Sequence, residues 1–259
     1  MSEFSPVYGP VKSWRYGCSL GIDPIGRVST CSFNCVYCQL GQIERSSLQR
    51  QTFVPTAAVV TELVPKLQKD LDVITVSGSG EPTLALNLGE IIIAVKEKTA
   101  TPVVVLTNGS MLGLESVRWD LRLADEVSVK LDAVTPERVR RVNRPRFAWD
   151  WSVFWHNLLR WREQFGGTLT VQTMLLSIWS EAERQMYIDR LKELQPDRVY
   201  LNIPRRPKPL RRLLQGRENL TAVENSTWLK PLSIDYLETF ARTIKEESQV
   251  PVSYAVALK

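Results

Sequence analysis

The stretch VITVSGSGEPT, residues 73–83, opens with four β-branched residues and ends in glycines and a glutamate. A β-branched run favours a strand, and the glycines after it mark a loop. TPVVVLTNG, residues 101–109, repeats this form and ends in Asn108 and Gly109. Between the two lies a segment of helical character at residues 85–99. This strand–loop–helix order predicts an α/β fold with a parallel sheet.

The same order recurs along most of the chain. Four more strand-like runs are GRVST (26–30), EVSVKLDA (126–133), TLTVQTMLL (168–176) and RVYLNIP (198–204). Helical patterns separate them, and one of these opens with a capping box formed by Ser180 and Glu183. About six such units predict right-handed crossovers and a barrel-like sheet. In a barrel of this kind, functional residues gather where the strands end.

Composition and charge narrow the class of protein. The chain has 259 residues, of which 44% are hydrophobic, so it is long enough to bury a full core. No run approaches the ~20 apolar residues of a membrane helix, and the start MSEFSPVYGP lacks the apolar centre of a secretory signal. We therefore expect a cytoplasmic protein with no membrane partner and with reduced cysteines. The net charge of +5 permits an anionic partner without requiring one.

Three of the four cysteines lie in TCSFNCVYCQLG, residues 30–41. Cys31, Cys35 and Cys38 are one too few for a closed tetrahedral zinc site, which would need Cys18 or the single histidine, His156, as its fourth ligand. A disulfide is disfavoured in a reducing compartment. Three thiolates can instead hold three irons of a [4Fe–4S] cluster and leave the fourth iron open for a non-protein ligand.

Polar residues follow the predicted strands at their C-terminal ends. Glu81, Asn108 and Asp132 each come directly after such a strand. Within EVSVKLDA the alternation of apolar and polar residues places Ser128, Lys130 and Asp132 on the inner face. A lysine inside a barrel is costly unless paired, so Lys130 either pairs with Asp132 or contacts a cofactor or substrate.

Several motifs together resemble the radical S-adenosylmethionine (radical SAM) enzymes. The spacing Cys31-x3-Cys35-x2-Cys38, with Tyr37 before the last cysteine, is similar to their signature. The resemblance covers roughly residues 16–204 and includes three further motifs in order: SGSGEPTL (77–84), LTNG (106–109) and VSVKLD (127–132). The segment YGPVKSWRYGCSLGID (8–23) resembles a bacterial and archaeal branch related to the wyosine-base synthases of tRNA modification.

The resemblance implies a fold and a chemistry. The fold would be a partial (β/α)6 TIM-like barrel over residues 1–204, with a C-terminal extension over residues 205–259 packed on it. The cofactors would be one [4Fe–4S] cluster and S-adenosylmethionine (SAM). One electron, from a donor such as flavodoxin or ferredoxin, would cleave SAM to methionine and a 5′-deoxyadenosyl radical. That radical would abstract hydrogen from the substrate, so we expect an enzyme, either an oxidoreductase or a transferase.

The resemblance also assigns residues to these cofactors. Cys31, Cys35 and Cys38 would bind the cluster, and Glu81 would accept a hydrogen bond from the methionyl ammonium. The remaining cofactor-binding residues would be Gly78 and Gly80 by close backbone approach, Tyr37 beside the adenine, and Asn108, Ser128 and Lys130 toward ribose or carboxylate oxygens.

Substrate residues are predicted from position. Gln172 and Asn202 alternate toward the lumen, where inward packing is the other interpretation. Arg205 and Arg206 open a basic segment after the sixth strand that could contact phosphates or form a solvated loop. The substrate would be an RNA base or a phosphate-bearing small molecule, with a peptide as a third class.

Cys18 is the only cysteine outside the cluster motif. A second cluster needs three or four more ligands, so the count predicts a single cluster and argues against pyruvate condensation of the wyosine-base type. Cys18 is either an inert buried thiol or, if it lies in the cofactor cleft, a reactive thiol or hydrogen donor. The alternative function is a non-catalytic, RNA-associated scaffold that binds zinc or a cluster. We expect a monomer or a weak homodimer.

Overall fold

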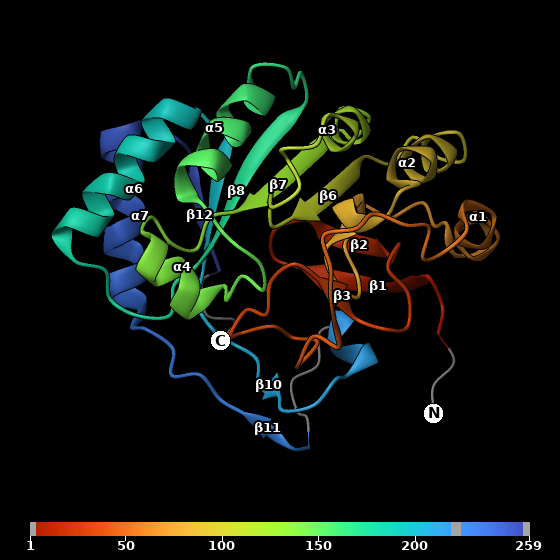
Figure 1. The fold of residues 1–259 in the computed structure, drawn as a ribbon, viewed down its shortest axis with the longest axis horizontal. Coiled ribbons are helices and arrows are strands. Elements are labelled where there is room, and N and C mark those ends of the chain that lie inside the picture. Colours follow the sequence, from red (N-terminus) through yellow and green to blue (C-terminus); the bar gives the residue numbers. More distant parts are fainter. Residues whose placement is uncertain (1–3, 219–223, 256–259) are drawn as a thin grey trace.

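The computed structural model describes residues 4–218 and 224–255, and within them one curved sheet of eight strands organises the molecule. The order across the sheet is β1-β2-β5-β6-β7-β8-β9-β12 (Figure 1). All neighbours are parallel except β1 and β2, which are antiparallel. The strands are β1 Val7–Ser13, β2 Gly17–Ile22, β5 Val73–Val76, β6 Val103–Thr107, β7 Glu126–Lys130, β8 Thr168–Met174, β9 Arg198–Asn202 and β12 Val252–Tyr254.

Helices follow the parallel strands and cover the outer, convex face of the sheet (Figure 1). The α-helices are α1 Thr56–Leu63, α2 Leu88–Lys96, α3 Glu115–Leu121, α4 Pro136–Val142, α5 Trp151–Arg162, α6 Glu181–Leu194 and α7 Ile234–Ser248. Three short 3₁₀ turns are η1 Val64–Lys66, η2 Pro82–Leu84 and η3 Leu214–Arg217. The predicted partial α/β barrel is confirmed by this arrangement.

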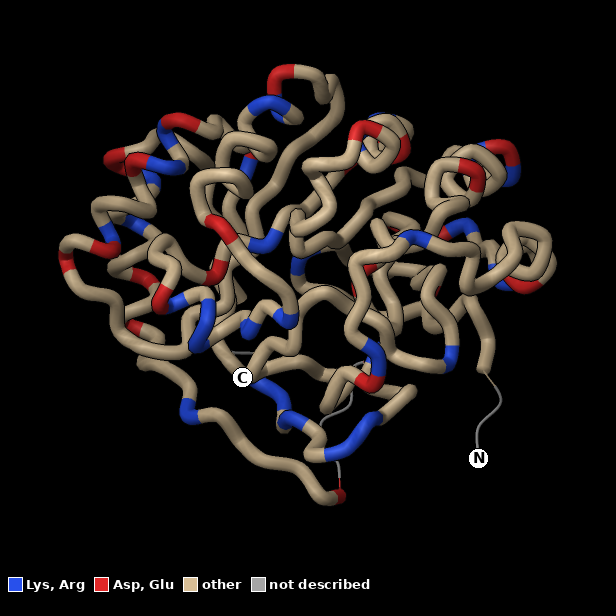
Figure 2. The backbone as a smooth tube through the Cα atoms, in the orientation of Figure 1, with Lys and Arg blue, Asp and Glu red and all other residues tan. Residues whose placement is uncertain are grey.

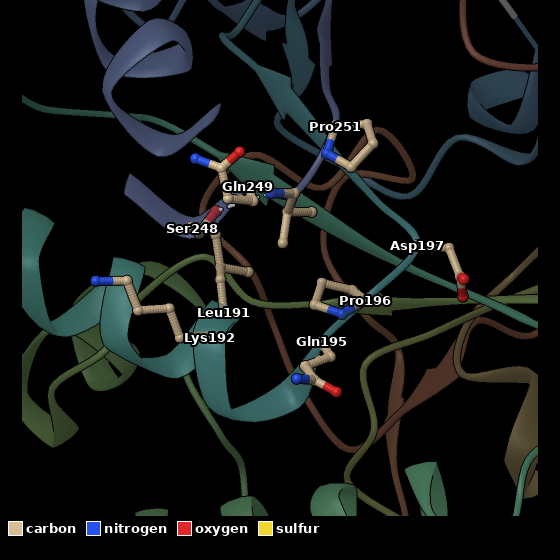
Figure 3. A pocket seen from close by; sticks show the side chains of 9 residues that line it. Leu191, Lys192, Gln195, Pro196, Asp197, Ser248, Gln249 and Pro251 are labelled. Atoms are coloured by element: carbon tan, nitrogen blue, oxygen red, sulfur yellow. Dashed lines mark hydrogen bonds between the residues drawn. The ribbon is translucent and has the colours of Figure 1, made fainter. Parts of the chain in front are cut away.

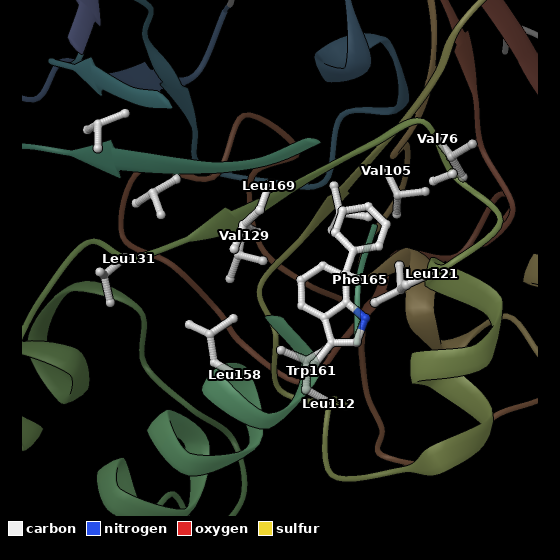
Figure 4. Packing of buried hydrophobic residues seen from close by; sticks show 14 of the residues in the cluster. Val76, Val105, Leu112, Leu121, Val129, Leu131, Leu158, Trp161, Phe165 and Leu169 are labelled. Carbon is white, nitrogen blue, oxygen red and sulfur yellow. The ribbon is translucent and has the colours of Figure 1, made fainter. Parts of the chain in front are cut away.

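Alternation along the strands separates the core from the lumen. On β7, Val127 and Val129 are fully buried in the main apolar cluster beneath the helices, together with Trp161 of α5 (Figure 4). Successive side chains on a strand point to opposite faces, so Ser128 and Lys130 face the lumen, as predicted. The outer layer therefore holds the main apolar core, whereas the inner face carries polar side chains beside a smaller apolar cluster of Tyr16, Val104 and Tyr200.

The strand that precedes the cysteines differs from the prediction. GRVST at residues 26–30 is not a strand of the main sheet; that place is taken by β2, which ends at Ile22. Asp23 Oδ1 accepts 3.0 Å hydrogen bonds from Ile25 N and Gly26 N, and Gly26 has φ 92°, so the chain turns here. Only the two-residue strand β3, Thr30–Cys31, remains, and it pairs with β4, Arg45–Ser46.

The C-terminal segment returns to the sheet. After β9, a two-stranded ribbon of β10 (Lys208–Pro209) and β11 (Ser226–Thr227) lies outside the sheet. The chain then forms α7 and β12, and β12 pairs in parallel with β9. β12 covers Val252–Tyr254, and residues 256–259 lie outside the described part. The predicted division at residue 204 stays a prediction.

A surface cavity of about 440 Å³ lies at the edge of the sheet where the parallel strands begin (Figure 3). Its lining comes from the C-terminal ends of α6 and α7 and from the starts of β9 and β12, and includes Leu191, Gln195, Asp197 and Pro251. It is therefore remote from the strand ends that carry the predicted site. Among the described residues no helix is long and apolar enough to cross a bilayer.

Candidate functional site

The three cysteines lie in a loop that crosses the edge where the parallel strands end. On one side of this loop, Thr30 bridges Gly80, and the Thr30 carbonyl accepts a 3.0 Å hydrogen bond from Glu81 N. On the other side, Phe33 bridges Pro145, which follows α4. These bridges therefore hold the loop against the segment after β5 and the segment after α4. Both segments carry polar side chains that approach the sulfur atoms.

Nitrogen donors point at the sulfur atoms of Cys31 and Cys35. Phe33 N and Asn108 Nδ2 lie 3.4 and 3.6 Å from Cys31 Sγ. Asn143 Nδ2 lies 3.7 Å from Cys35 Sγ. N–H···S hydrogen bonds favour the thiolate over the thiol and are one of the factors that set the potential of an iron–sulfur cluster.

Apolar side chains enclose the cysteine loop. Cys35 is buried with Phe33 and Val142, and Trp149 packs against the same group. Burial is the largest cause that raises the pKa of all three thiols, that of Cys35 to about 12. Lys130 acts in the opposite direction on Cys35. The neutral thiol is therefore favoured in the protein alone, and a bound cation would offset the cost of ionising it.

Glu81 follows β5 and keeps acceptor capacity to spare. Its Oε1 accepts from Thr83 N at 3.2 Å, and from Thr83 Oγ1 and Thr107 Oγ1 at 2.6 Å each. Its Oε2 accepts from Asn108 N at 2.8 Å. Burial raises the pKa of Glu81, and these hydrogen bonds act against the shift. Because each carboxylate oxygen has about two acceptor positions, Oε2 can accept one more donor.

Asn108 links Glu81 to the cysteine loop. Its backbone nitrogen binds Glu81, and its side-chain Nδ2 lies 3.1 Å from Ser32 Oγ as well as near Cys31 Sγ. Its Oδ1 accepts from Ser110 N at 2.8 Å. Three contacts hold the side-chain amide and one holds the backbone nitrogen, which fixes the carboxylate of Glu81 relative to Cys31.

Gly78 and Gly80 are required by the protein's own packing. Gly78 has φ 87°, and a Cβ there would collide with the Asp23 side chain. A Cβ on Gly80 would collide with the Thr30 carbonyl, at the bridge that holds the cysteine loop. Close approach at these glycines was predicted, but the groups that approach are Asp23 and Thr30. Their contact with a cofactor stays a prediction.

Lys130 and Tyr37 meet at the back of the cysteine loop. Lys130 Nζ donates to the Tyr37 hydroxyl at 2.9 Å and lies 5.0 Å from the centre of its ring. The Tyr37 hydroxyl in turn donates to Asp132 Oδ2. The predicted Lys130–Asp132 pair is thus made through Tyr37 rather than by direct contact, and an adenine contact of Tyr37 stays a prediction.

Asp132 is the centre of this polar group. Besides Tyr37, it accepts from Asn143 Nδ2 at 2.6 Å and from Met174 N at 2.7 Å. Burial lowers the pKa of Lys130, but attraction from Asp132, and from Cys35 and Cys38 where these are ionised, outweighs it, and the pKa is raised. Lys130 therefore stays charged inside the lumen.

Comparison with known proteins shows the family to which the chain belongs. The sequence pattern of the radical SAM superfamily matches residues 27–191. The chain belongs to the radical SAM superfamily. It is 46% identical over 258 residues to a UPF0026 protein of Synechocystis, a match that covers 98% of this chain and 97% of that protein. A UPF0026 protein of Methanocaldococcus jannaschii is 34% identical over 207 residues, which cover 78% of this chain and 64% of that protein.

Solved radical SAM structures share the fold. Streptococcus suis SuiB, bound to the precursor peptide SuiA, matches with a TM-score of 0.63 at 14% identity, covering 89% of this chain and 47% of that chain. The predicted superfamily and its partial barrel are confirmed, and with them the use of a [4Fe–4S] cluster and SAM. The finer placement beside the wyosine-base synthases stays a prediction.

The loop of this radical SAM protein fits a cluster rather than a single ion. Within residues 4–218 and 224–255, no three His, Cys, Asp or Glu side chains are arranged to hold one metal ion. The thiolates of a [4Fe–4S] cluster bind different irons, so they need not meet at one point. Three thiols in one apolar loop, with N–H donors at Cys31 and Cys35, suit such a cluster. The zinc alternative needs a fourth ligand, and His156 is exposed on α5.

The predicted lumen residues lie on the inner face of the sheet, and they differ in their contacts. Ser128 Oγ is buried and has no partner in hydrogen-bonding geometry, although the Tyr16 hydroxyl is near. Gln172 Nε2 lies 3.5 Å from that hydroxyl. Asn202 Oδ1 accepts from the next backbone nitrogen, Ile203 N, at 3.0 Å. These residues are near the site, and their contact with a substrate stays a prediction.

The basic segment after β9 folds back over the cysteine loop. Leu213 N donates to Leu40 O at 2.9 Å, so the segment lies beside the residues that follow Cys38. Arg205 binds the Ala255 carbonyl, and Arg206 Nη1 donates to Glu218 O at 3.0 Å. Both predicted arginines therefore contact backbone carbonyls, and a phosphate contact stays a prediction.

Cys18 is not brought to the site. It lies at the start of β2, at the opposite end of the strands from the cysteine loop, and packs against the main apolar core. Its backbone nitrogen donates to Asp72 at 2.7 Å. The condition for the hydrogen-donor hypothesis, a place in the cofactor cleft, is not met in this structure.

Sequence reasoning missed Asn143 and the turn formed by Trp14, Arg15 and Tyr16. Asn143 reaches Cys35 across 108 residues of sequence, and no local pattern signals that contact. The turn joins β1 to β2 and places its aromatic rings against Tyr200 of β9. The dense aromatic and basic run WRY was the available signal for it.

Proposed function

We propose that this radical SAM protein is an enzyme that abstracts hydrogen from a substrate held in the barrel lumen. The observation that carries the proposal is the link made by Asn108, which joins the carboxylate of Glu81 to the sulfur of Cys31. A cluster ligand and a carboxylate with a spare acceptor position therefore lie side by side. This is the arrangement expected where the ammonium of SAM must be oriented next to an iron.

When bound, the cluster and SAM would supply the redox chemistry, the reductive cleavage of SAM. The protein orients and shields. Glu81 would hold the ammonium, and Phe33, Val142 and Trp149 exclude water from the cysteine loop. Lys130, protonated and facing the lumen, would bind an oxygen atom of the cofactor or of the substrate. The reaction class, oxidoreductase or transferase, is left open by these contacts.

The substrate class that we propose is an RNA base or a phosphate-bearing small molecule. Figure 2 supports an anionic substrate: basic positions gather on the segment after β9 and toward the middle of the barrel, whereas many acidic positions lie on the outer helices. Lys208 of β10 is close enough to Cys38 and Cys35 for their charges to influence its pKa, which burial lowers overall. An anion that enters past this segment would meet a positive field next to the cluster.

We also propose an electron donor, a cellular compartment and an oligomeric state for the protein. A flavodoxin or ferredoxin would supply the electron, and the protein would act in the cytoplasm as a monomer or weak homodimer. An acidic electron carrier would be attracted by the net charge of +5.

Anaerobic purification tests the enzyme assignment. We expect a brown protein with about four irons per chain that forms 5′-deoxyadenosine when dithionite and SAM are added. The variant Cys35→Ala should lose the iron and the product, whereas Cys18→Ala, a matched loss of a thiol outside the loop, should keep the iron. A colourless wild-type protein with stoichiometric zinc would instead support the non-catalytic scaffold.

The substrate class needs a second experiment. Deuterated fractions of tRNA, peptides and small molecules would be incubated separately with the active enzyme. Deuterium that appears in 5′-deoxyadenosine from the tRNA or small-molecule fraction would support the proposed classes. Transfer from the peptide fraction alone would contradict them.

A further inference from the structure

Arg15 is a cation turned into the lumen without an acidic partner. It lies in the turn between β1 and β2, and its guanidinium carbon is 5.3 Å from the centre of the Trp14 ring and 5.9 Å from that of Tyr16. Its Nε is buried and, among the described residues, has no hydrogen-bond acceptor. Burial lowers the pKa of Arg15. A stacked guanidinium keeps its N–H groups free for a planar or tetrahedral oxyanion.

Aromatic side chains fix Arg15 in place. The Trp14 and Tyr16 rings pack edge-on against Tyr200, with centroids 5.8 and 5.6 Å from it. The Tyr16 hydroxyl is in turn anchored by a 2.9 Å hydrogen bond to Glu126 Oε1. This clamp joins the turn to β7 and β9, so Arg15 is held by the sheet rather than by a free loop.

Two other cations, Arg206 and Lys130, lie close enough to Arg15 for their charges to interact with it. Repulsion from Arg15 lowers the pKa of Arg206, after the larger effect of burial. Arg15 also opposes the upward shift of the pKa of Lys130. The nearest carboxylate, Glu126, is already bound by Tyr16 and, at 2.7 Å, by Thr170 Oγ1, and it forms no ion pair with Arg15 among the described residues. Arg15 itself is therefore left without an acidic partner among the described residues.

An unpartnered hydroxyl lies on the same face. Ser128 Oγ is 2% exposed by residue and has no hydrogen-bond partner, although β7 directs it into the lumen two residues before Lys130. Buried hydroxyls without a partner are costly and are usually satisfied by a ligand or water. Arg15, Lys130 and Gln172 are each only partly buried, so solvent reaches these side chains.

We propose that Arg15, Ser128 and Lys130 form an oxyanion-binding subsite that takes a phosphate or carboxylate group of the substrate. The proposal rests on the proposed function, since it names the group by which the substrate would be held in the lumen. Arg15 would bind the oxyanion through two parallel N–H donors, Ser128 would donate its hydroxyl hydrogen, and Lys130 would use a donor that Tyr37 leaves free.

The test measures anion binding directly, without SAM or reductant. Inorganic phosphate and sodium acetate would be titrated into the cluster-loaded protein at constant ionic strength and followed by calorimetry. We expect at least one of them to bind, and the bound one identifies a phosphate or a carboxylate as the preferred group. The variant Arg15→Gln should weaken binding by about tenfold or more, because a charge-assisted hydrogen bond contributes roughly 1.5–3 kcal/mol.

Two further variants probe a second residue of the subsite and provide a control. Ser128→Ala removes a hydroxyl that has no hydrogen-bond partner, so folding should be unaffected. It should weaken anion binding about fivefold, the loss of one neutral hydrogen bond. Arg160→Gln, on the exposed side of α5, removes the same charge and should leave the affinity unchanged. Binding of neither anion, or equal weakening by Arg15→Gln and Arg160→Gln, would overturn the subsite.

A final measurement tests whether the anion binds at the substrate site or at the SAM site. Saturating SAM should leave the anion affinity unchanged if the subsite belongs to the substrate, whereas full displacement of the anion by SAM would overturn that assignment. Because binding is read without turnover, a protein that binds phosphate and forms no 5′-deoxyadenosine would refute the proposed function and leave the subsite standing.

Discussion

Glu81 shows how a single residue can be both structural and functional. Four hydrogen bonds from Thr83, Thr107 and Asn108 hold its buried carboxylate, and one acceptor position on Oε2 remains. These bonds fix the direction of the carboxylate, and Asn108, which donates to Oε2, also approaches Cys31 Sγ. A side chain so constrained can orient a ligand without losing further conformational freedom.

The variant Glu81→Gln should weaken SAM binding by about tenfold or more, because it removes the charge that the methionyl ammonium would meet. It should also lower stability, since the new amide would face Asn108 N, which is itself a donor. Equilibrium dialysis with labelled SAM measures the first effect and urea unfolding the second. Glu90→Gln, on the exposed face of α2, is the matched control, and equal affinities for the two variants would contradict the prediction.

The buried phenol of Tyr187 should make the stability of the folded protein depend on pH in the alkaline range. It is fully buried on α6, its hydroxyl lies 2.6 Å from Thr173 Oγ1, and burial raises its pKa above the usual value near 10. In the unfolded chain the phenol ionises above about pH 10, whereas in the folded protein it stays neutral, so the unfolded state loses protons first. Its contribution to stability is complete below pH 10 and is lost as pH rises above it.

The variant Tyr187→Phe should therefore be less stable than the wild type at pH 7, because the substitution removes the hydrogen bond to Thr173. The difference should shrink as pH rises above 10, because phenylalanine cannot ionise. Urea unfolding at several pH values measures both. A difference that stays constant up to pH 11 would contradict the assignment.

At the scale of elements, the cysteine loop depends on backbone contacts with its neighbours. The bridge from Thr30 to Gly80 and the bridge from Phe33 to Pro145 hold its two sides. Because Gly80 has no Cβ, the loop can lie directly on the segment after β5. The position of the sulfur atoms is therefore set by strand ends that lie on rigid elements, which suits a catalytic centre.

Helix α6 begins at the predicted capping box. Ser180 Oγ accepts from Glu183 N at 3.3 Å, and the Glu183 side chain accepts from Ser180 N at 2.9 Å. The variant Ser180→Ala should lower the free energy of unfolding by about 1 kcal/mol, with SAM affinity unchanged. Ser180→Thr, which keeps the hydroxyl, should stay close to the wild type in urea unfolding. A loss as large in Ser180→Thr would point to a cause other than the cap.

At the scale of the whole molecule, the C-terminal segment completes the barrel. Phe240 of α7 is buried against Trp179 and Tyr187, with ring centroids 5.7 and 5.9 Å away, and β12 pairs with β9. These contacts cover the end of the sheet that would otherwise be an open edge.

A chain that ends after Pro204 should therefore fail to fold cooperatively. It would expose the apolar surface that Leu237, Phe240 and Ile244 cover, which amounts to several kcal/mol of lost burial. Thermal unfolding followed by circular dichroism measures the outcome, with the full chain as the control. A sharp transition in the shortened chain would show that residues 1–204 are an independent domain.

Local patterns determined a large part of this protein from sequence alone. The β-branched runs and the apolar spacing predicted the strands and helices, since burial on one face requires a fixed period. The cap at Ser180 and the inward direction of Ser128 and Lys130 follow from hydrogen bonding and alternation within a few residues. The cysteine spacing predicted the cluster site, because three thiols in one loop need no distant partner.

Only the tertiary structure decided which distant residues meet at the site. Asn143 reaches Cys35, Tyr37 reaches Asp132, and Arg15 enters the lumen beside Tyr200, each across a long stretch of chain. Such contacts depend on how the sheet curves and on where the connecting loops return, and no short-range period encodes them. The spacing of the cysteines therefore predicts the chemistry of the loop. The charge and shape of the lumen around the loop instead depend on how the whole barrel packs.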